Sequence, residues 1–200
     1  MSHWIETLEA LEGLYGTPAK PSLVKVLDRM SPSYLAHIEA SRFCVLTTVG
    51  PEGTDASPRG DEGPVVQALD PQTLLLPDWK GNERIDSLRN VVRDGRVSLM
   101  FLTTGSNIAM RVNGSAKITV APEILARFTR EGKSPRSVLV IQIAEVYPQC
   151  ARAILRSDLW GTAGKTLPSM GEMLREATWG DFDAESYDRD WPQRAAATMW

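Results

Sequence analysis

One stretch of this 200-residue chain decides its organisation: Asp78-Trp79-Lys80-Gly81-Asn82-Glu83-Arg84-Ile85-Asp86-Ser87-Leu88-Arg89-Asn90. It follows the short apolar run Leu74-Leu75-Leu76, which Pro77 ends. The order of residue types predicts a strand, then a glycine-containing turn, then a helix over about 83–93. Ile85, Leu88 and Val92 recur at helical spacing and give that helix one apolar face.

The ends of this helix are marked by residues that cap helices. Asn82 is typical of an N-cap, and Asp94-Gly95 is typical of a stop. A helix start offers unpaired N–H groups and a positive dipole end. With Lys80 and Arg84 beside it, the stretch predicts a site for a phosphate group. The alternative is a solvated turn that carries ordinary surface charges.

Composition narrows the class of protein. The chain is 42% apolar and 24% charged, with a net charge of −3, which is typical of a globular protein that buries a core. The charge gives no general attraction to nucleic acid or to an anionic membrane, so neither is expected as a partner. Residues 1–7 lack the pattern of a signal peptide, and no stretch is long enough to span a bilayer. We therefore expect a cytoplasmic protein.

Cysteine and histidine are scarce. The chain contains Cys44 and Cys150, each in or beside an apolar run, and both are expected to be buried reduced thiols. The only histidines are His3 and His37, so no metal site and no histidine-dependent triad is predicted. Glycine-rich phosphate loops, zinc-protease motifs and nucleophile elbows are all absent.

The chain changes character twice. Residues 1–40 show helical patterns, with Ser31-Pro32 as a start signal for the third of three helices. These helices are expected to cover a sheet or a subunit boundary. Short strands with turns between them then argue for an antiparallel meander or barrel, and the expected strands are 43–49, 54–57, 65–69, 73–76, 97–103, 108–120 and 137–146. The residues 58–64 between two of them are expected to be an irregular break.

One dipeptide leaves two interpretations of the segment 108–120 open. Asn113-Gly114 is, by rule, a strong signal for a two-residue hairpin. The alternative is a bulge in a single bent strand. On the residues alone the hairpin is favoured.

The last quarter of the chain is expected to be helical and aromatic. One helix is expected earlier, over 122–130, and in the last quarter helices are expected over 150–155 and 169–177, with a loop over 159–168. The tail after Ala177 carries aromatic residues at a density that suggests docking onto a surface: Trp179, Phe182, Tyr187, Trp191 and Trp200. We divide the chain into an N-terminal helical segment (1–40), a barrel domain (41–148) and a C-terminal tail that packs on the barrel or on a dimer partner (149–200).

An ordered set of segments resembles the pyridoxamine 5′-phosphate oxidase-related family of FMN-binding split-barrel proteins. The segments that carry the resemblance are Ala56-Ser57-Pro58-Arg59-Gly60-Asp61, Leu74-Leu75-Leu76-Pro77-Asp78, residues 81–90, Arg96-Val97-Ser98-Leu99-Met100-Phe101 and Arg111-Val112-Asn113-Gly114. Trp160 and residues 168–173 resemble the tail of one branch of that family. The resemblance implies a mainly β fold with flanking helices, a six-stranded antiparallel Greek-key split β-barrel. It also favours one bent strand over 108–120, which we adopt.

The same resemblance implies an FMN site shared by the two subunits of a homodimer. Arg84 matches the basic residue that the family places on the flavin phosphate, and Asn82 matches the small polar residue before it. Glu83 departs from the family, which often has a second basic residue there, and Lys80 or Arg59 would restore that charge. Ser106, Asn107 and Arg111 match positions that the partner subunit contributes. The expected cofactor-binding set is Arg59, Pro77, Asp78, Trp79, Lys80, Gly81, Asn82, Arg84, Ser106, Asn107 and Arg111.

The function implied is that of an FMN-dependent oxidoreductase acting on a small molecule. No side chain is named as catalytic, because the flavin would carry the redox step. Pyridoxamine phosphate itself is not the expected substrate, because those oxidases use a C-terminal arginine and histidine pair and this chain has no histidine after His37. The alternative is a protein that binds flavin, the deazaflavin F420 or haem without turnover, as a carrier or sensor.

Overall fold

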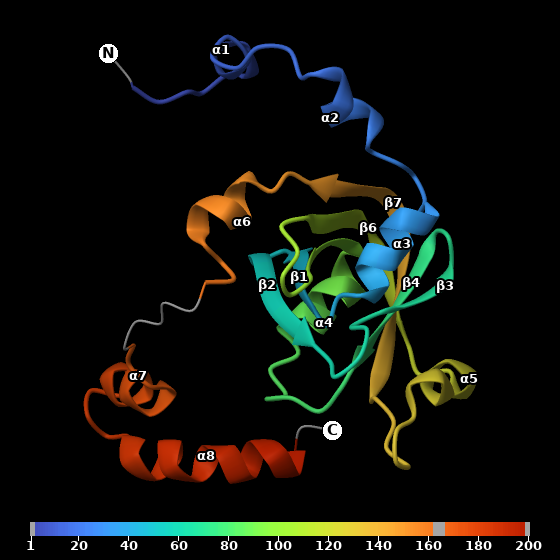
Figure 1. Ribbon diagram of the computed structural model, residues 1–200. Helices are drawn as coiled ribbons and strands as arrows, with labels where there is room; N and C mark the ends of the chain where they lie inside the picture. The colour runs from blue at the N-terminus through green and yellow to red at the C-terminus, as the bar shows by residue number, and fades with distance from the viewer. Residues whose placement is uncertain (1–2, 162–166, 199–200) are drawn as a thin grey trace.

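The structure is a computed structural model that describes residues 3–161 and 167–198 (Figure 1). Its strands are β1 (Phe43–Gly50), β2 (Gly53–Gly60), β3 (Gln67–Asp70), β4 (Thr73–Asp78), β5 (Arg96–Leu102), β6 (Ala109–Thr119) and β7 (Ser137–Gln149). Its helices are α1 (Leu8–Glu12), α2 (Lys20–Val24), α3 (Pro32–Glu39), α4 (Asp86–Arg93), α5 (Pro122–Leu125), α6 (Arg152–Ser157), α7 (Met170–Ala177) and α8 (Ala184–Thr198), with a 3-10 turn η1 (Ala126–Phe128) after α5.

The strands form one antiparallel sheet in the order β2-β1-β5-β6-β7-β4-β3. Although β2 and β4 are far apart in this order, Arg59 of β2 forms an ion pair with Asp78 of β4 at 2.6 Å. The sheet must therefore curl until these two strands face each other, which is the shape of a split barrel. The predicted fold class is confirmed, but the sheet has seven strands and not six, because the short strand β3 pairs with β4 at one edge.

All seven strands lie within three residues of their predicted bounds, and β2 and β7 each end three residues later than predicted. The predicted irregular break over 58–64 is wrong for its first three residues, because Pro58, Arg59 and Gly60 continue the ladder opposite β1, and the break covers only 61–64. Proline lacks a backbone N–H and is tolerated in strands mainly at sheet edges. Since β2 is an edge strand, Pro58 interrupts no second ladder, and Arg59 is carried on a regular strand.

Asn113-Gly114 forms no hairpin. The segment is a single strand, β6, whose pairing with β7 shifts register between Asn113 and Gly114, so the bent strand is confirmed. A Cβ atom on Gly114 would lie 2.0 Å from the backbone oxygen of Gln142. The glycine is therefore present because the two strands approach too closely for any side chain at the bulge.

The core lies inside the curl of the sheet, and α4 is part of it. Its members include Leu46, Leu99, Val112 and Ile141, none of which is more than 1% exposed. Val91 of α4 packs into the same cluster. Figure 1 shows α4 in the hollow of the sheet. The helix is thus fixed from one side by the barrel wall while its first turn stays at the barrel mouth.

The N-terminal segment is helical, as predicted, but only its last helix joins the core. Ser31 caps α3 by accepting a hydrogen bond from the Tyr34 N–H at 3.3 Å, and Ile38 of α3 is fully buried. In contrast, α1 and α2 bury no residue. Within this chain the first two helices therefore do not cover the sheet.

The C-terminal tail forms a helical pair. The helix α7 begins at a capping box in which Ser169 and Glu172 bond each other's backbone N–H groups. The aromatic tail, for which no helix was predicted, contains α8, and Tyr187 stacks on Trp191 with ring centres 6.1 Å apart. Part of the predicted loop 159–168 and Trp200 lie outside the described residues. The domain division and the docking of the tail stay predictions.

The two cysteines differ. Cys44 on β1 is buried, as predicted, and burial raises the pKa of its thiol to about 12. Cys150 is exposed, contrary to the prediction, because it follows the end of β7 and lies outside the sheet. Across the part of the chain that the structure describes, every helix is too short or too polar to cross a bilayer.

Candidate functional site

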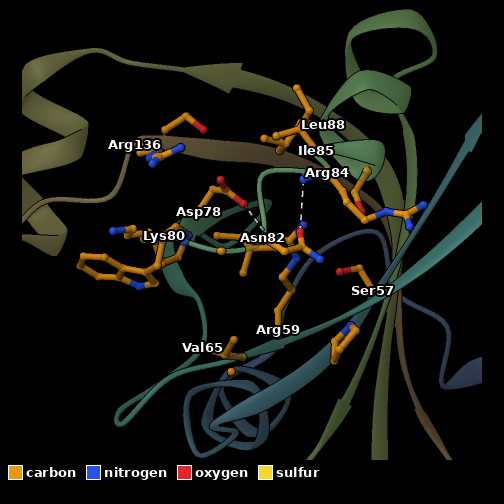
Figure 2. Close-up of a pocket in the computed structure, with 18 of the residues that line it drawn as sticks. Ser57, Arg59, Val65, Asp78, Lys80, Asn82, Arg84, Ile85, Leu88 and Arg136 are labelled. Carbon is orange, nitrogen blue, oxygen red and sulfur yellow. Dashed lines mark hydrogen bonds and ion pairs between the residues drawn. The ribbon is translucent and has the colours of Figure 1, made fainter. Parts of the chain in front are cut away.

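An open cavity of about 990 Å³ lies between the edge strand β2 and the segment that joins β4 to α4 (Figure 2). Distant parts of the sequence meet there: Arg42, residues 55–62, Val65, residues 76–88, Arg136 and Ser137. Its volume is at the upper end of the range of about 300–1,000 Å³ that is usual for small-molecule sites. The cavity is therefore large enough for a cofactor together with a small substrate.

The strand β4 brings the site residues to the barrel mouth. It is buried from Thr73 to Pro77, because it lies between β3 and β7 in the sheet. Its last residue, Asp78, accepts a backbone hydrogen bond from Arg136 at 3.0 Å, just before β7 begins. The chain then turns away from the sheet, so the residues after Asp78 line the cavity.

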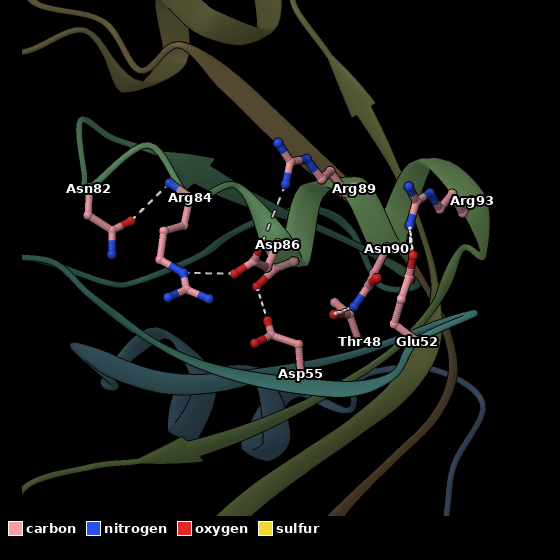
Figure 3. Close-up of polar contacts among 10 residues, drawn as sticks. Thr48, Glu52, Asp55, Asn82, Arg84, Asp86, Arg89, Asn90 and Arg93 are labelled. Carbon is pink, nitrogen blue, oxygen red and sulfur yellow. Dashed lines mark hydrogen bonds and ion pairs between the residues drawn. The ribbon is translucent and has the colours of Figure 1, made fainter. Parts of the chain in front are cut away.

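The turn between β4 and α4 differs from the prediction at its end. Asn82 does not cap the helix; its side-chain oxygen accepts a hydrogen bond from the Arg84 N–H at 3.2 Å and closes a local turn (Figure 3). Glu83 and Ile85 both have left-handed backbones, with φ of 62° and 52°. The helix therefore begins at Asp86 and not at residue 83. An asparagine side chain competes with helical hydrogen bonding in this way.

Lys80 and Arg84 line the same cavity but lie on opposite sides of it. Figure 2 shows Lys80 on the Asp78 side of Arg59 and Arg84 on the Ser57 side. The Arg84 side chain is 76% exposed, and its Nε lies 3.0 Å from a carboxylate oxygen of Asp86. Lys80 and Arg84 are therefore not placed to contact the same group of a ligand. Of the two, Arg84 is nearer the start of α4.

Arg59 lies at the centre of the cavity. Its side chain is 20% exposed and its Nη1 donates to Asp78 at 2.6 Å. Its Nε is buried and has no hydrogen-bond partner among the residues that the structure describes. A buried donor without an acceptor costs free energy unless a ligand or water completes it. This atom is the clearest indication in the cavity that a hydrogen-bond acceptor binds there.

Trp79 is held by a buried carboxylate. The Asp61 side chain is 2% exposed, forms an ion pair with Arg130, and accepts a hydrogen bond from the Trp79 indole N–H at 3.2 Å. The Arg130 guanidinium also lies 5.8 Å from the centre of the Trp79 ring. The indole is thus fixed in orientation on one wall of the cavity, whatever its role toward a ligand.

The inner face of α4 is tied to the barrel by polar side chains (Figure 3). Ser87 donates to Asp55 of β2 at 2.5 Å, and Asn90 donates to Thr48 of β1 at 3.1 Å. On the outer face, Arg89 and Arg93 are exposed and pair with acidic residues. This agrees with the prediction that both arginines belong to the solvated face.

Eight of the predicted site residues line the cavity, and three lie elsewhere. Those that line it are Arg59, Pro77, Asp78, Trp79, Lys80, Gly81, Asn82 and Arg84. Ser106 is in the β5–β6 turn, where its carbonyl accepts from the Trp160 indole at 2.8 Å, and Arg111 lies over the Tyr147 ring at 5.2 Å. Asn107 is in the same turn. Whether these residues contact a cofactor stays a prediction.

Sequence reasoning missed several lining residues. Arg42, Asp55, Ser57 and Arg136 come from elements whose neighbours in space are distant in sequence. Arg136 reaches the site because β7 pairs with β4, and its guanidinium forms an ion pair with Glu83 at 2.8 Å that lowers the pKa of that carboxyl. The only available sequence signal was that Arg136 immediately precedes the predicted strand 137–146.

The charges of the cavity are nearly balanced. Basic side chains line it at Arg42, Arg59, Lys80, Arg84 and Arg136, and acidic ones at Asp55, Asp61, Glu62, Asp78, Glu83 and Asp86. The cavity therefore has no general attraction for anions, and an anion must be held by particular donors. In the described parts of the chain, no group of three metal-ligating side chains is placed to hold a metal ion.

Comparison with known proteins gives the family. A sequence model described as pyridoxamine 5′-phosphate oxidase matches residues 30–150. This covers the barrel and every cavity residue, and the chain belongs to the pyridoxamine 5′-phosphate oxidase family. None of the curated proteins matches the chain.

Several solved structures are similar to this chain. HupZ of Group A Streptococcus is similar with a TM-score of 0.50 and 16% sequence identity, over 60% of this chain and 94% of that one. An FMN-binding protein of Syntrophomonas wolfei has a TM-score of 0.44 and 16% identity, over 58% of this chain and 86% of that one. General Stress Protein 26 of Bacillus anthracis has a TM-score of 0.44 and 15% identity, over 58% and 91%.

Proposed function

We propose that this protein binds FMN in the cavity between β2 and α4. The observation that carries the proposal is the buried Nε of Arg59, a donor without a partner at the centre of a cavity that is lined by other donors. Family membership supports the same conclusion, and one similar structure is of a protein named as FMN-binding.

The residues of the cavity suit the three parts of FMN. Arg84, the Ser57 hydroxyl beside it and the first turn of α4 would hold the phosphate, because a guanidinium and free helix N–H groups are good phosphate donors. Val65, Leu76, Pro77 and Leu88 supply apolar wall for the ring. Arg59 would donate from its free Nε to an acceptor on the ring, and Lys80 would bond polar groups on the other side.

We propose that the functional unit is a homodimer. The pairing registers place Pro58, Val45, Met100, Arg111 and Tyr147 in one row across five strands. Their neighbours Cys44, Leu46, Leu99, Phe101, Met110, Val112 and Val146 are buried in the core, so this row is on the outer face of the sheet. Pro58 and Met100 on that face are exposed. A second copy seated there would receive Arg111, and with it Ser106 and Asn107, as the resemblance implies.

We propose that the protein acts as an FMN-dependent oxidoreductase on a small molecule other than pyridoxamine phosphate. When bound, the flavin would supply the electron transfer. The chain's own residues would orient the ring through Arg59, hold the indole of Trp79 beside it through Asp61, and exclude water with Leu76 and Leu88. The wide cavity leaves room for a substrate next to the cofactor.

One feature favours the second candidate, a flavin-binding carrier or sensor without turnover. Histidine, cysteine and tyrosine are the side chains that most often move protons or act as nucleophiles near neutral pH, and none of them is among the described residues that line the cavity. The same composition offers no usual axial ligand for haem.

The test begins with the purified protein and its absorption spectrum. FMN, riboflavin and F420 are titrated in turn, and tight binding of FMN with weaker binding of riboflavin is expected, because riboflavin lacks the phosphate. Failure of all three to bind would end the proposal. Anaerobic addition of NADH or NADPH, followed by reoxidation with small-molecule acceptors, then separates an oxidoreductase from a carrier.

A further inference from the structure

The first part of the described chain forms an exposed arm, residues 3–24. Every residue in it is exposed, including Ile5, Leu8, Leu11 and Leu14, which are 50%, 70%, 40% and 67% exposed. Helices as short as α1 and α2 are marginal in water without tertiary packing. The arm is nevertheless attached firmly, because Leu27 exchanges two backbone hydrogen bonds with Val146 of β7. An arm with this composition needs a surface to pack on.

The arm carries unpaired negative charge beside its apolar residues. Leu8, Leu11 and Glu12 are spaced as neighbours on one helical face of α1, with Glu9 next to them. None of Glu6, Glu9 and Glu12 forms an ion pair within residues 3–161 and 167–198. A surface complementary to α1 therefore has an exposed apolar side chain beside basic side chains that are not already in ion pairs with carboxylates.

The helix α6 presents a face of that kind. Arg152, Leu155 and Arg156 have the same helical spacing, and Leu155 is 61% exposed. Neither arginine forms an ion pair in the described part of the chain. The outer face of α4 looks similar, with Val92 76% exposed between Arg89 and Arg93, but both of those arginines already have carboxylate partners.

The two complementary faces do not meet within one chain. Figure 1 shows α1 projecting away from the barrel and clearly separated from α6. Both are nevertheless attached to the same strand, because Leu27, which follows the arm, bridges Val146, and α6 follows the end of β7 at Gln149. This end of β7 also holds Tyr147, which belongs to the row of residues on the outer face of the sheet. A contact between copies would therefore extend the interface proposed there.

We propose that α1 of one copy packs on α6 of a second copy, and that α1 of the second copy packs in the same way on α6 of the first. Leu8 and Leu11 would cover Leu155, while Glu9 and Glu12 would face Arg152 and Arg156. In a two-fold dimer this contact occurs twice, so its modest contribution to the stability of the dimer is doubled. The proposal concerns the arm alone and does not depend on what the cavity binds.

Cross-linking of the full chain tests the contact directly. In a Cys150→Ser background, a Leu8→Cys protein and a Leu155→Cys protein are mixed and treated with a short bismaleimide. We expect a covalent dimer that forms only in the mixture. A mixture that stays monomeric on a denaturing gel would overturn the proposal, as would an intrachain link in the chain that carries both cysteines. The matched control replaces Leu155→Cys with Val92→Cys, and equal cross-linking there would also overturn it.

Charge reversal gives an independent test on exposed residues that should leave folding unchanged. Glu9→Arg with Glu12→Arg, or Arg152→Glu with Arg156→Glu, should each weaken the dimer about tenfold or more in sedimentation equilibrium, since like charges then face each other. Combining all four changes should restore the dimer constant to within about threefold. Reversals that leave the constant unchanged, or a combination that fails to restore it, contradict the contact. Flavin content is measured separately, so failure of the cavity proposal is distinguishable.

Discussion

Replacing Arg84 with alanine should weaken FMN binding by an amount that the structure allows us to estimate. A charge-assisted hydrogen bond to the phosphate should contribute about 1.5–3 kcal/mol. Arg84 first has to leave Asp86, with which it pairs at 3.0 Å in an exposed position, and such a pair is worth about 0–1 kcal/mol. The net loss of binding free energy is roughly 0.5–3 kcal/mol, which corresponds to a dissociation constant about 2- to 150-fold higher.

The same reasoning gives the opposite sign for Asp86. Asp86→Asn removes the carboxylate that competes for Arg84 and repels the phosphate, so FMN should bind about two- to fivefold more tightly. In an Arg84→Ala background the gain should be smaller, because the competition no longer exists and only the repulsion remains. The three variants form a double-mutant cycle that isolates the interaction between the two side chains.

The assay is titration of each apoprotein with FMN, followed by the quenching of flavin fluorescence. Arg89→Ala is the matched control, because Arg89 also pairs with Asp86 but is on the outer face of α4. That control should bind FMN like the parent protein. An Arg84→Ala protein with unchanged affinity would refute the phosphate position, and an equal loss in Arg89→Ala would show that the wrong face of the helix was chosen.

Other contacts give four further predictions. Gly114→Ala should destabilise the protein by more than about 2 kcal/mol, because its Cβ would lie 2.0 Å from the Gln142 oxygen, whereas Gly81→Ala, whose Cβ would meet nothing within 4 Å, should melt like the parent. Asp61→Asn should cost about 1–3 kcal/mol in urea unfolding, because the buried Asp61 side chain loses the charge that pairs with the partly exposed Arg130; the exposed neighbour Glu62→Gln should cost little, and similar losses would contradict this. Iodoacetamide should alkylate Cys150, whose pKa is lowered chiefly by a backbone hydrogen bond from Arg152, and spare Cys44 in the native protein. Because burial raises the Cys44 pKa from 9.0 to about 12, the unfolded thiol ionises first, so stability is unaffected below pH 9 and falls as the pH rises from 9 to 12. A Cys44→Ala protein that shows the same alkaline loss would contradict this assignment.

The strands were predictable because their signals are local. Runs of apolar and β-branched residues marked most of them, with β2 the exception, and the family resemblance settled Asn113-Gly114 in favour of a bent strand. The reason behind that bend is not local, since Gly114 is required by the approach of Gln142 on another strand. Likewise, Pro58 led to the prediction that the strand ends at Ser57, because nothing in the nearby sequence shows that β2 pairs with a neighbouring strand on one side only.

The site was predictable in its residues and less so in its geometry. The segment 77–84 does line the cavity, but periodicity could not show that the Asn82 side chain would close a turn and delay the helix to Asp86. It also could not show that Lys80 and Arg84 would separate. Arg136 was missed because its position depends on the pairing of β4 with β7, which only the folded sheet establishes.

The free edge of β2 has a consequence for how a flat ligand binds. On one side β2 is paired with β1 along its full length, and residues 55–60 of the same strand border the cavity. A planar heterocycle with alternating hydrogen-bond donors and acceptors could bond the main-chain groups on the unpaired edge of β2, as an eighth strand would. Occupancy would then shield main-chain groups that otherwise invite edge-to-edge association, so the ligand-free protein should be the form that aggregates.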